Sequence, residues 1–305
     1  MERKSKKNKP KILVVLGPTA TGKSDLAVKL ARKYNGEVIS ADSRQVYTAL
    51  NIGTGKITKK EMRGISHHML DIVSPKKVFS VAEFQKRAIY AMADITGRGK
   101  LPIICGGTGL YIKSIVDNVI YPEVPANLKL RKKLEKKSAP ELFEILKKLD
   151  SKRAKTIEKQ NPVRLIRAIE IATVLGKVPG IKKQQNPHDI LQIGLKLPDN
   201  VLKKKIHDRL IIRLKKGMVR EAENLHKNGL SWKRMRALGL EYRCLADYLE
   251  KGVSKQELIR KLDSEIWQYV KRQITWFKRD KNIKWHEPTE VAKIQKEIGK
   301  FLKII

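Results

Sequence analysis

Residues 17–24 read Gly-Pro-Thr-Ala-Thr-Gly-Lys-Ser, a full match to the phosphate-binding loop pattern G-x-x-x-x-G-K-[ST]. In such a loop, backbone N–H groups and the start of the next helix face an anion, while the lysine adds a positive charge. The candidate phosphate-binding residues are Gly17, Pro18, Thr19, Ala20, Thr21, Gly22, Lys23 and Ser24, and the Ser24 hydroxyl is also a candidate ligand of a Mg²⁺ cofactor. The motif predicts a bound diphosphate or triphosphate and leaves open which molecule carries it.

Asp42 is the second candidate for chemistry. P-loop NTPases bind magnesium partly through an acidic residue that ends a second strand. The strand expected at 101–105 ends in Cys-Gly-Gly instead, whereas Asp42 directly follows the strand expected at 37–40. A carboxylate at the carboxyl end of a parallel strand points into the ligand crevice. A cap on the turn into Ser43 would explain the same residue, so the sequence leaves both interpretations open.

The chain is strongly basic. Its 305 residues include 67 lysines and arginines against 31 acidic residues, a formal net charge of +36. Such a surplus favours a polyanionic partner, above all nucleic acid, although a lysine-rich compositional bias is the alternative. Two cysteines indicate neither a disulfide framework nor a cysteine-based zinc site, and no apolar run reaches the ~20 residues that span a bilayer. We therefore expect a cytoplasmic monomer without a membrane anchor.

The elements that position these residues alternate between strands and helices, which predicts an α/β fold with a parallel sheet flanked by helices. Strands are expected at 12–16, 37–40, 101–105 and 191–197, and helices at 25–34, 81–97 and 200–228, the last with Gly217 as a possible break. Residues 123–180 read as helical and basic, with one helix at 163–175. The resulting division is a P-loop core (9–121 and 188–305), a helical insertion (122–187, ending in a polar linker from 182) and a basic disordered tail (1–8).

A further helix is expected at 257–278. Its apolar stripe is typical of a core face. Lys271 and Arg272, interleaved with Trp267 and Trp276, suit phosphate contact plus base stacking. A solvated amphipathic helix explains the same pattern, and both readings stay open.

Several blocks together resemble the tRNA dimethylallyltransferase (isopentenyl-tRNA transferase) family in its bacterial form. They are the P-loop, 39–47 (ISADSRQVY), 52–56 (IGTGK), 67–72 (HHMLDI), 106–111 (GGTGLY), 161–170 (NPVRLIRAIE) and 271–277 (KRQITWF). These blocks follow one another in order from about residue 11 to 285. The chain departs from the usual family pattern at 239–243 (GLEYR), where Gly-Tyr-Arg or Gly-Tyr-Lys is common, and at 267–270 (WQYV), which is less basic.

The resemblance implies transfer of a dimethylallyl group from dimethylallyl diphosphate to the exocyclic amine of the adenosine 3′ of the anticodon. It implies Asp42 as the general base, Thr108 as a catalytic-site residue and Arg243 as a diphosphate contact. Contacts to the anticodon stem-loop are implied for Asp42, Ser43, Arg44, Gln45, Arg131, Arg164, Leu165, Ile166, Arg167, Ala168, Trp267, Lys271 and Arg272. Competing interpretations are a small-molecule P-loop kinase, a free-adenylate prenyltransferase and a non-catalytic ATP-regulated RNA-binding protein.

Overall fold

The computed structural model describes residues 9–180 and 182–303, so the tail expected at 1–8 lies outside the described residues. The chain divides into two compact units. Unit 1 comprises the residues up to Asp117 and those from Gln185 onward, and unit 2 is Asn118–Gln184. These bounds differ by a few residues from the expected insertion at 122–187.

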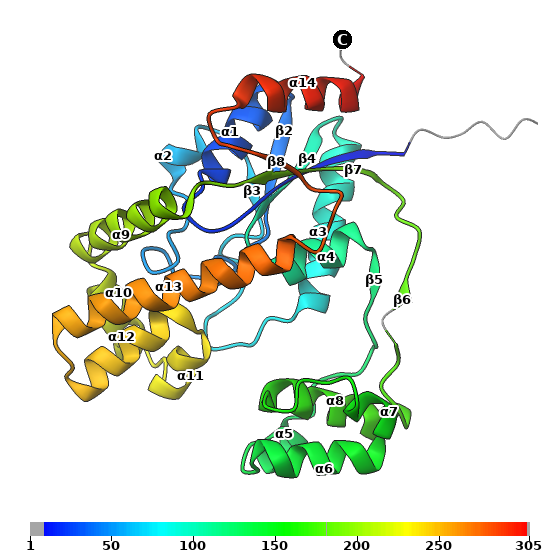
Figure 1. The fold of residues 1–305 in the computed structure, drawn as a ribbon, viewed down its shortest axis with the longest axis vertical. Helices are drawn as coiled ribbons and strands as arrows, with labels where there is room; N and C mark the ends of the chain where they lie inside the picture. The colour runs from blue at the N-terminus through cyan, green and yellow to red at the C-terminus, as the bar shows by residue number, and fades with distance from the viewer. Residues whose placement is uncertain (1–8, 181, 304–305) are drawn as a thin grey trace, which may run out of the picture. The chain divides into compact units, whose positions relative to one another are not determined.

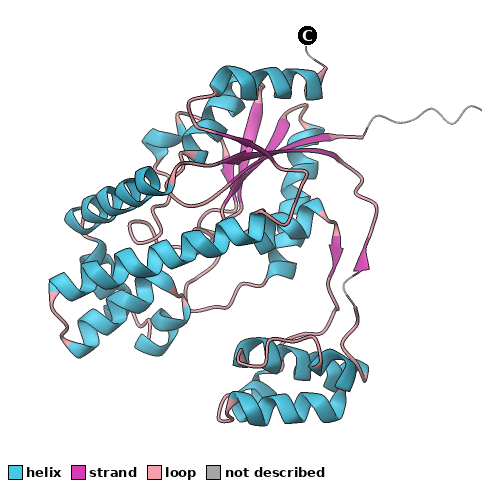
Figure 2. Ribbon diagram, in the orientation of Figure 1, coloured by secondary structure: helices cyan, strands magenta, loops and turns pink. Residues whose placement is uncertain are grey.

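Unit 1 is built on a six-stranded parallel sheet with the strand order β3-β2-β4-β1-β7-β8 (Figures 1 and 2). The strands are β1 (Lys11–Leu16), β2 (Gly36–Ser40), β3 (His67–His68), β4 (Leu101–Gly106), β7 (Asp189–Leu195) and β8 (Lys284–His286). Central β1 is apolar and buried from Ile12 to Leu16, as expected of a parallel strand covered on both faces. The P-loop follows β1 directly, and Asp42 follows β2, so both lie at the carboxyl edge of one parallel sheet, on strands that flank β4.

Helices cover both faces of this sheet. They are α1 (Lys23–Lys33), α2 (Lys59–Met62), α3 (Val81–Gly97), α4 (Gly109–Val116), α9 (Asp199–Lys215), α10 (Met218–Lys227), α11 (Trp232–Ala237), α12 (Leu240–Lys251), α13 (Lys255–Phe277) and α14 (Val291–Leu302). One buried cluster joins α1 and α14 to the sheet, and a larger one joins α3, α4 and the helices from α9 to α13. The apolar stripe of α13 lies in the larger cluster, which confirms its prediction as a core face.

The α/β fold with its parallel sheet is confirmed, and the local differences have physical causes. The helix expected at 200–228 breaks at Gly217, which takes the left-handed backbone at φ 96° between α9 and α10. The strand expected at 191–197 begins at Asp189, because β7 pairs with β1 from Lys11 onward. No helix in the described part of the chain is long and apolar enough to cross a bilayer.

Unit 2 contains the helices α5 (Leu128–Leu134), α6 (Ala139–Leu149), α7 (Ser151–Ala154) and α8 (Pro162–Leu175), which enclose a separate apolar core. The expected start of α8 is confirmed, because Asn161 caps the helix by accepting from Arg164 N and proline occupies its first turn. The interpretation of the segment after 182 as linker was wrong in part. Here β6 (Lys182–Lys183) pairs antiparallel with β5 (Val119–Ile120).

Candidate active site

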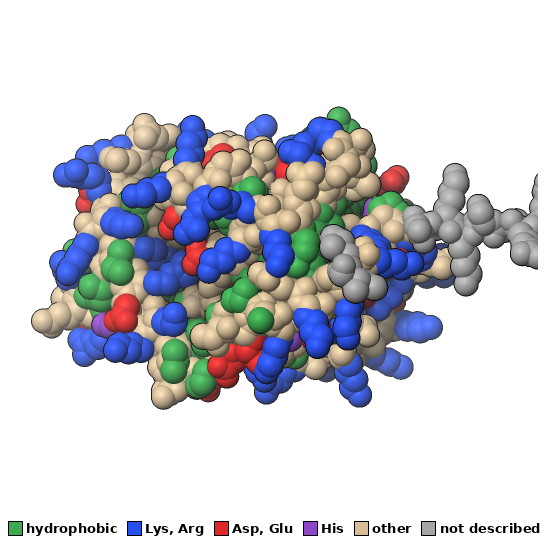
Figure 3. All heavy atoms as spheres, turned by 90° about the horizontal axis from the view of Figure 1, so that it is seen from above, with side chains coloured by type: hydrophobic (Ala, Val, Ile, Leu, Met, Phe, Trp, Pro, Cys, Tyr) green, Lys and Arg blue, Asp and Glu red, His purple; other side chains and the backbone are tan. Residues whose placement is uncertain are grey.

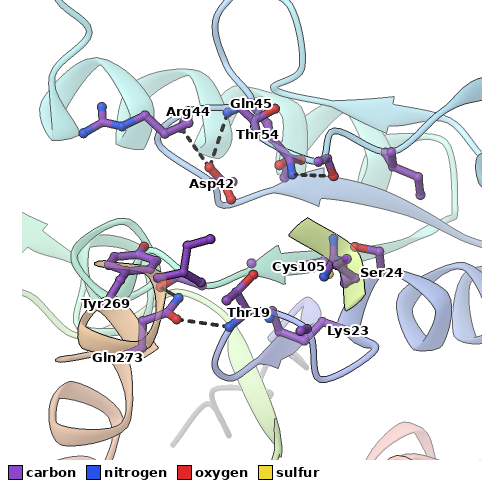
Figure 4. A pocket seen from close by; sticks show the side chains of 18 of the residues that line it. Thr19, Lys23, Ser24, Asp42, Arg44, Gln45, Thr54, Cys105, Tyr269 and Gln273 are labelled. Carbon is purple, nitrogen blue, oxygen red and sulfur yellow. Dashed lines mark hydrogen bonds between the residues drawn. The ribbon is translucent and has the colours of Figure 1, made fainter. Parts of the chain in front are cut away.

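The P-loop lines a cavity of about 710 Å³ in unit 1. The candidate residues that line it are Thr19, Ala20, Gly22, Lys23, Ser24, Asp42, Ser43, Arg44, Gln45, Arg243 and Arg272. Gly22 caps α1 in the left-handed conformation, so the loop turns directly into the helix start. Figure 4 shows Thr19 and Lys23 on one side of this space and Asp42, Arg44 and Gln45 on the other. The fold thus brings the phosphate-binding loop and the candidate base together.

Lys23 is folded back onto its own loop, where its ammonium group donates a hydrogen bond to the Pro18 carbonyl. Burial lowers the pKa of Lys23 to about 8, and the nearby Arg209 guanidinium adds to this decrease. A bound phosphate would therefore favour the protonated, charged form of this amine.

Asp42 caps its turn with one oxygen. Its Oδ1 accepts from Arg44 N at 2.8 Å and from Gln45 N at 3.3 Å (Figure 4). No described residue donates a hydrogen bond to Oδ2. The two interpretations of this residue are thus compatible, because one oxygen fixes the turn while the other is available to a ligand in the cavity.

Thr108 belongs to the same site through the Asp42 turn, since its Oγ1 accepts from Ser43 N at 3.0 Å. Next to it lies Tyr269 of α13, which lines the cavity. Burial and the nearby Asp42 carboxylate raise the pKa of Tyr269, so its phenol stays protonated at neutral pH. The motif reading missed Tyr269, although the aromatic segment at 267–270 had marked its neighbourhood.

Gln273 is a second residue that sequence reasoning missed. This buried side chain accepts from Thr19 N at 3.1 Å and donates to the Gly107 carbonyl at 2.8 Å (Figure 4). A Cβ on Gly107 would lie 2.3 Å from the Gln273 amide nitrogen, so only glycine fits at this close approach. The GGTG block of the sequence therefore has a packing role against α13, and no local pattern could have shown its partner.

Positive charge gathers around the cavity. Its lining includes Lys23, Arg44, Lys205, Arg209, Arg213, Arg243 and Arg272. Arg209 makes no hydrogen bond or ion pair within the described residues, whereas Arg213 lies 3.3 Å from the Glu241 carboxylate. Figure 3 shows lysine and arginine side chains spread over the face in view, with few carboxylates between them. Both the site and the wider surface thus suit anionic ligands.

Arg243 lines the cavity from α12, but its guanidinium also donates to Glu265 at 2.8 Å. That carboxylate offsets part of its charge. Arg209 has no such partner among the described residues, and it lies close enough to Lys23 to lower the pKa of that lysine. Arg209 is therefore the better placed cation for a diphosphate. It lies in the basic helix α9, where no sequence signal separated it from its neighbours.

The insertion candidates divide into buried and exposed groups. Leu165, Ile166 and Ala168 pack in the core of unit 2, at 0%, 8% and 4% exposed. Their side chains are therefore not available to a ligand, and the predicted tRNA contacts at these positions would have to be made by the backbone. Arg164 is 61% exposed and pairs with Glu158 on the surface.

Arg131 and Arg167 share one buried carboxylate. Glu170, 1% exposed, accepts from Arg131 Nε at 2.7 Å and from Arg167 Nη1 at 2.8 Å. Both arginines are accordingly part of the internal structure of unit 2 as well as of its surface. Leaving such a carboxylate without its partners would be strongly destabilising.

The candidates on α13 differ in their surroundings. Lys203 of α9 lies over the Trp267 ring, 4.8 Å from its centroid, so this tryptophan already has a cationic partner. Arg272 lies over Tyr269 and lines the cavity, whereas Lys271 is exposed away from the cavity lining.

The end of β4 offers no anionic metal ligand. Cys105 occupies that position, and burial raises the pKa of its thiol to about 12, so it remains neutral. The described residues contain no cluster of three or more His, Cys, Asp or Glu side chains suited to a metal ion. The exposed Ser24 hydroxyl fits Mg²⁺ all the same, because this ion commonly keeps several waters and binds through few protein oxygens together with substrate phosphates.

Comparisons with known proteins agree on one family. The family model for IPP transferase matches residues 45–280. A tRNA dimethylallyltransferase of Caldanaerobacter subterraneus subsp. tengcongensis is 44% identical over 289 residues, which cover 90% of each chain. The crystal structure of the tRNA isopentenylpyrophosphate transferase of Bacillus halodurans is 35% identical, with a TM-score of 0.73 and 97% of both chains covered. A eukaryotic dimethylallyltransferase acting on tRNA is 27% identical, also with a TM-score of 0.73, over 88% of this chain and 70% of its own.

Proposed function

The chain belongs to the IPP transferase family, and on that premise we propose that it transfers a dimethylallyl group from dimethylallyl diphosphate to tRNA. The acceptor is the exocyclic amine of the adenosine 3′ of the anticodon. One observation carries the proposal: a single cavity is lined by both the P-loop and Asp42. A phosphate-binding loop beside a carboxylate suits a reaction in which a diphosphate leaves and an amine loses a proton.

Asp42 is the proposed general base. The adenine amine is barely basic and becomes acidic as it bonds to carbon, so a carboxylate within hydrogen-bond reach can accept the proton. Oδ1 holds the turn through Arg44 N and Gln45 N, which leaves Oδ2 as the proton acceptor. Thr108 supports this turn through its hydrogen bond from Ser43 N.

The P-loop amides, Lys23 and Arg209 are the proposed partners of the diphosphate. As the allylic C–O bond lengthens, negative charge grows on the leaving group, and cations fixed beside it stabilise that charge. Arg243 is retained as a second contact, because it lines the same cavity, with the Glu265 ion pair moderating its charge. Ser24 would hold Mg²⁺, which supplies further charge stabilisation on the diphosphate oxygens when bound.

The net charge of +36 supports tRNA as the acceptor rather than a free nucleotide. A small-molecule kinase would use the same loop but would explain neither this charge nor the similarity to tRNA-modifying enzymes. For the RNA contacts we propose Ser43, Arg44 and Gln45 at the cavity, Arg164 with Arg131 and Arg167 on unit 2, and Trp267, Lys271 and Arg272 on α13. We further propose that the protein works in the cytoplasm as a monomer.

Radiolabelled dimethylallyl diphosphate tests the proposal. The protein is incubated with Mg²⁺ and, in parallel, with unmodified tRNA, a transcript lacking the adenosine 3′ of the anticodon, or AMP. We expect label only in the unmodified tRNA. Label in AMP would indicate a free-adenylate prenyltransferase, and label in the transcript without that adenosine would contradict the proposed acceptor position.

A further inference from the structure

Glu221, on α10, holds three consecutive backbone N–H groups of one loop. Its Oε2 accepts from Asn51 N at 2.9 Å and from Ile52 N at 2.7 Å, while Oε1 accepts from Gly53 N at 2.9 Å. The Tyr242 hydroxyl also donates to Oε1, at 2.7 Å. Hydrogen bonds to an ionised carboxylate are about twice as strong as neutral ones, so this contact fixes the loop backbone firmly.

The loop is fixed from a second side by the Tyr242 ring. A Cβ on Gly53 would lie 2.7 Å from the ring carbon and the hydroxyl oxygen of Tyr242, so glycine alone allows this approach. Burial and the neighbouring Glu221 carboxylate raise the pKa of Tyr242 well above its ordinary value. The tyrosine therefore remains a hydrogen-bond donor. Because its ring already contacts Gly53, the loop cannot move toward α12.

The other side of the loop forms part of the cavity wall through Thr54 and Gly55. The Gly53 carbonyl accepts from Arg213 at 2.8 Å, and the Gly55 carbonyl lies 3.5 Å from the Gln45 amide nitrogen that donates to it. Both partners line the cavity, and the Gln45 backbone N–H donates to Asp42 Oδ1. Residues 51–55 thus link Glu221 to groups on the cavity wall.

We propose that Glu221 is a positioning residue for prenyl transfer. Glu221 does not line the cavity itself. It fixes residues 51–55, and these set the orientation of Gln45 beside the candidate base and of Arg213 in the basic lining. The proposal rests on the prenyl-transfer function above and adds a residue that no motif of the sequence had marked.

Glu221→Gln tests the role, with Glu223→Gln on the same helix as the matched control. The glutamine keeps the shape, but its single carbonyl oxygen accepts at most two hydrogen bonds. Its NH₂ group would face backbone N–H or hydroxyl donors, with which it cannot form hydrogen bonds as a donor. We expect faster hydrogen exchange at the amides of residues 51–53. We also expect kcat to fall by about 10- to 100-fold, the scale of a small misplacement of reacting groups, with little change in the KM for dimethylallyl diphosphate. The control should match the wild type in all three measurements.

Gly53→Ala displaces the same loop from the Tyr242 side, so its effect on kcat should overlap with that of Glu221→Gln. The fall in kcat of the double variant should then be smaller than the product of the two single fold-changes. Wild-type kcat in Glu221→Gln despite faster exchange or a lower melting temperature would overturn the proposal and leave Glu221 a structural residue. Unchanged exchange would overturn it too.

Should Glu221→Gln not fold, Tyr242→Phe takes its place. This variant keeps the ring and removes only one of the four hydrogen bonds. A smaller fall in kcat would support the proposal, and wild-type kcat in this folded variant would overturn it. Failure of the wild-type protein to prenylate tRNA would instead contradict the proposed function, and the exchange measurement separates the two cases.

Discussion

The buried side chain of Gln273 accepts a hydrogen bond from the backbone N–H of Thr19, across 254 residues of sequence. The same amide group donates to the Gly107 carbonyl, so one residue of α13 ties the P-loop to the loop that carries Thr108. Both halves of the site, diphosphate binding and support of the base, therefore depend on the placement of α13.

Gln273→Met should weaken both halves. Methionine keeps the approximate size, but Thr19 N and the Gly107 carbonyl lose this partner, at a cost of about 1–3 kcal/mol for each buried group left unsatisfied. We expect a lower melting temperature and a lower affinity for dimethylallyl diphosphate. Gln268→Met, at an exposed position of the same helix, serves as the control. Wild-type donor affinity in a destabilised Gln273→Met would restrict this residue to a purely structural role.

Asp42→Asn should bind both substrates and transfer slowly. Asparagine retains an oxygen that can accept from Arg44 N and Gln45 N, so the turn is preserved while the proton acceptor is lost. Removal of a general base typically lowers the rate about 10²- to 10⁴-fold. Single-turnover prenylation with substrate affinities measured in parallel checks this. A wild-type transfer rate would mean that Asp42 is only a turn cap.

Binding of the diphosphate should take up protons between about pH 8 and 10. Burial lowers the pKa of Lys23 to about 8 in the free protein, so the ammonium group loses its proton as the pH rises through that value. A bound diphosphate favours the charged form and raises the pKa again, so donor affinity should fall as the pH rises above about 8. Calorimetric titrations at pH 8.5, in two buffers of different ionisation enthalpy, measure the uptake.

Lys23→Met supplies the baseline for those titrations, because it reports the protonation of the ligand and of other groups. At pH 6.5 the wild type and the variant should take up equal numbers of protons on binding, since Lys23 is already charged at that pH. Equal uptake at pH 8.5 as well would show that Lys23 does not contact the diphosphate.

Arg209→Ala should weaken dimethylallyl diphosphate binding more than Arg243→Ala. Arg209 makes no hydrogen bond or ion pair within the described residues, whereas Arg243 shares its charge with Glu265. A lost charge-assisted hydrogen bond costs about 1.5–3 kcal/mol, which corresponds to roughly 10- to 150-fold in affinity. Equilibrium binding of the donor measures both variants. A larger loss with Arg243→Ala would favour the assignment implied by the family resemblance over that drawn from the geometry.

Arg164→Ala should weaken tRNA binding without affecting stability. Its surface pair with Glu158 is worth little to folding, and removal of one phosphate contact reduces the salt-dependence slope by about 1. Arg167→Ala, in contrast, should also lower the stability of unit 2, because it removes a donor from buried Glu170. Filter binding at several salt concentrations, with melting curves, separates the two effects. An unchanged slope for Arg164→Ala would remove it from the RNA interface.

Local patterns were enough to predict four of the six strands of the sheet and to mark the P-loop and Asp42 as candidates, whereas the short edge strands β3 and β8 were missed. Each rests on neighbouring residues: an apolar run before a glycine-rich turn, or a carboxylate directly after a strand. The break at Gly217 and the cap at Asn161 are equally local.

The remaining site residues depend on contacts between distant segments. In the sequence, Gln273 is one polar residue of an amphipathic helix, and its role follows only from the packing of α13 against the P-loop. Arg209 is likewise one cation among many in α9. The buried state of Leu165 depends in the same way on how α8 packs against α6. Residue types and spacing carry no record of such packing.

The order in which the chain is synthesised has a consequence for the fold. Central β1 pairs with β7, so the sheet stays incomplete until the whole of unit 2 has been made. Unit 2 is one continuous stretch with its own apolar core, whereas the P-loop contacts Gln273, which is synthesised more than 250 residues later. A polypeptide released before α13 would contain the complete phosphate-binding motif and still lack the contact that joins it to the Thr108 loop.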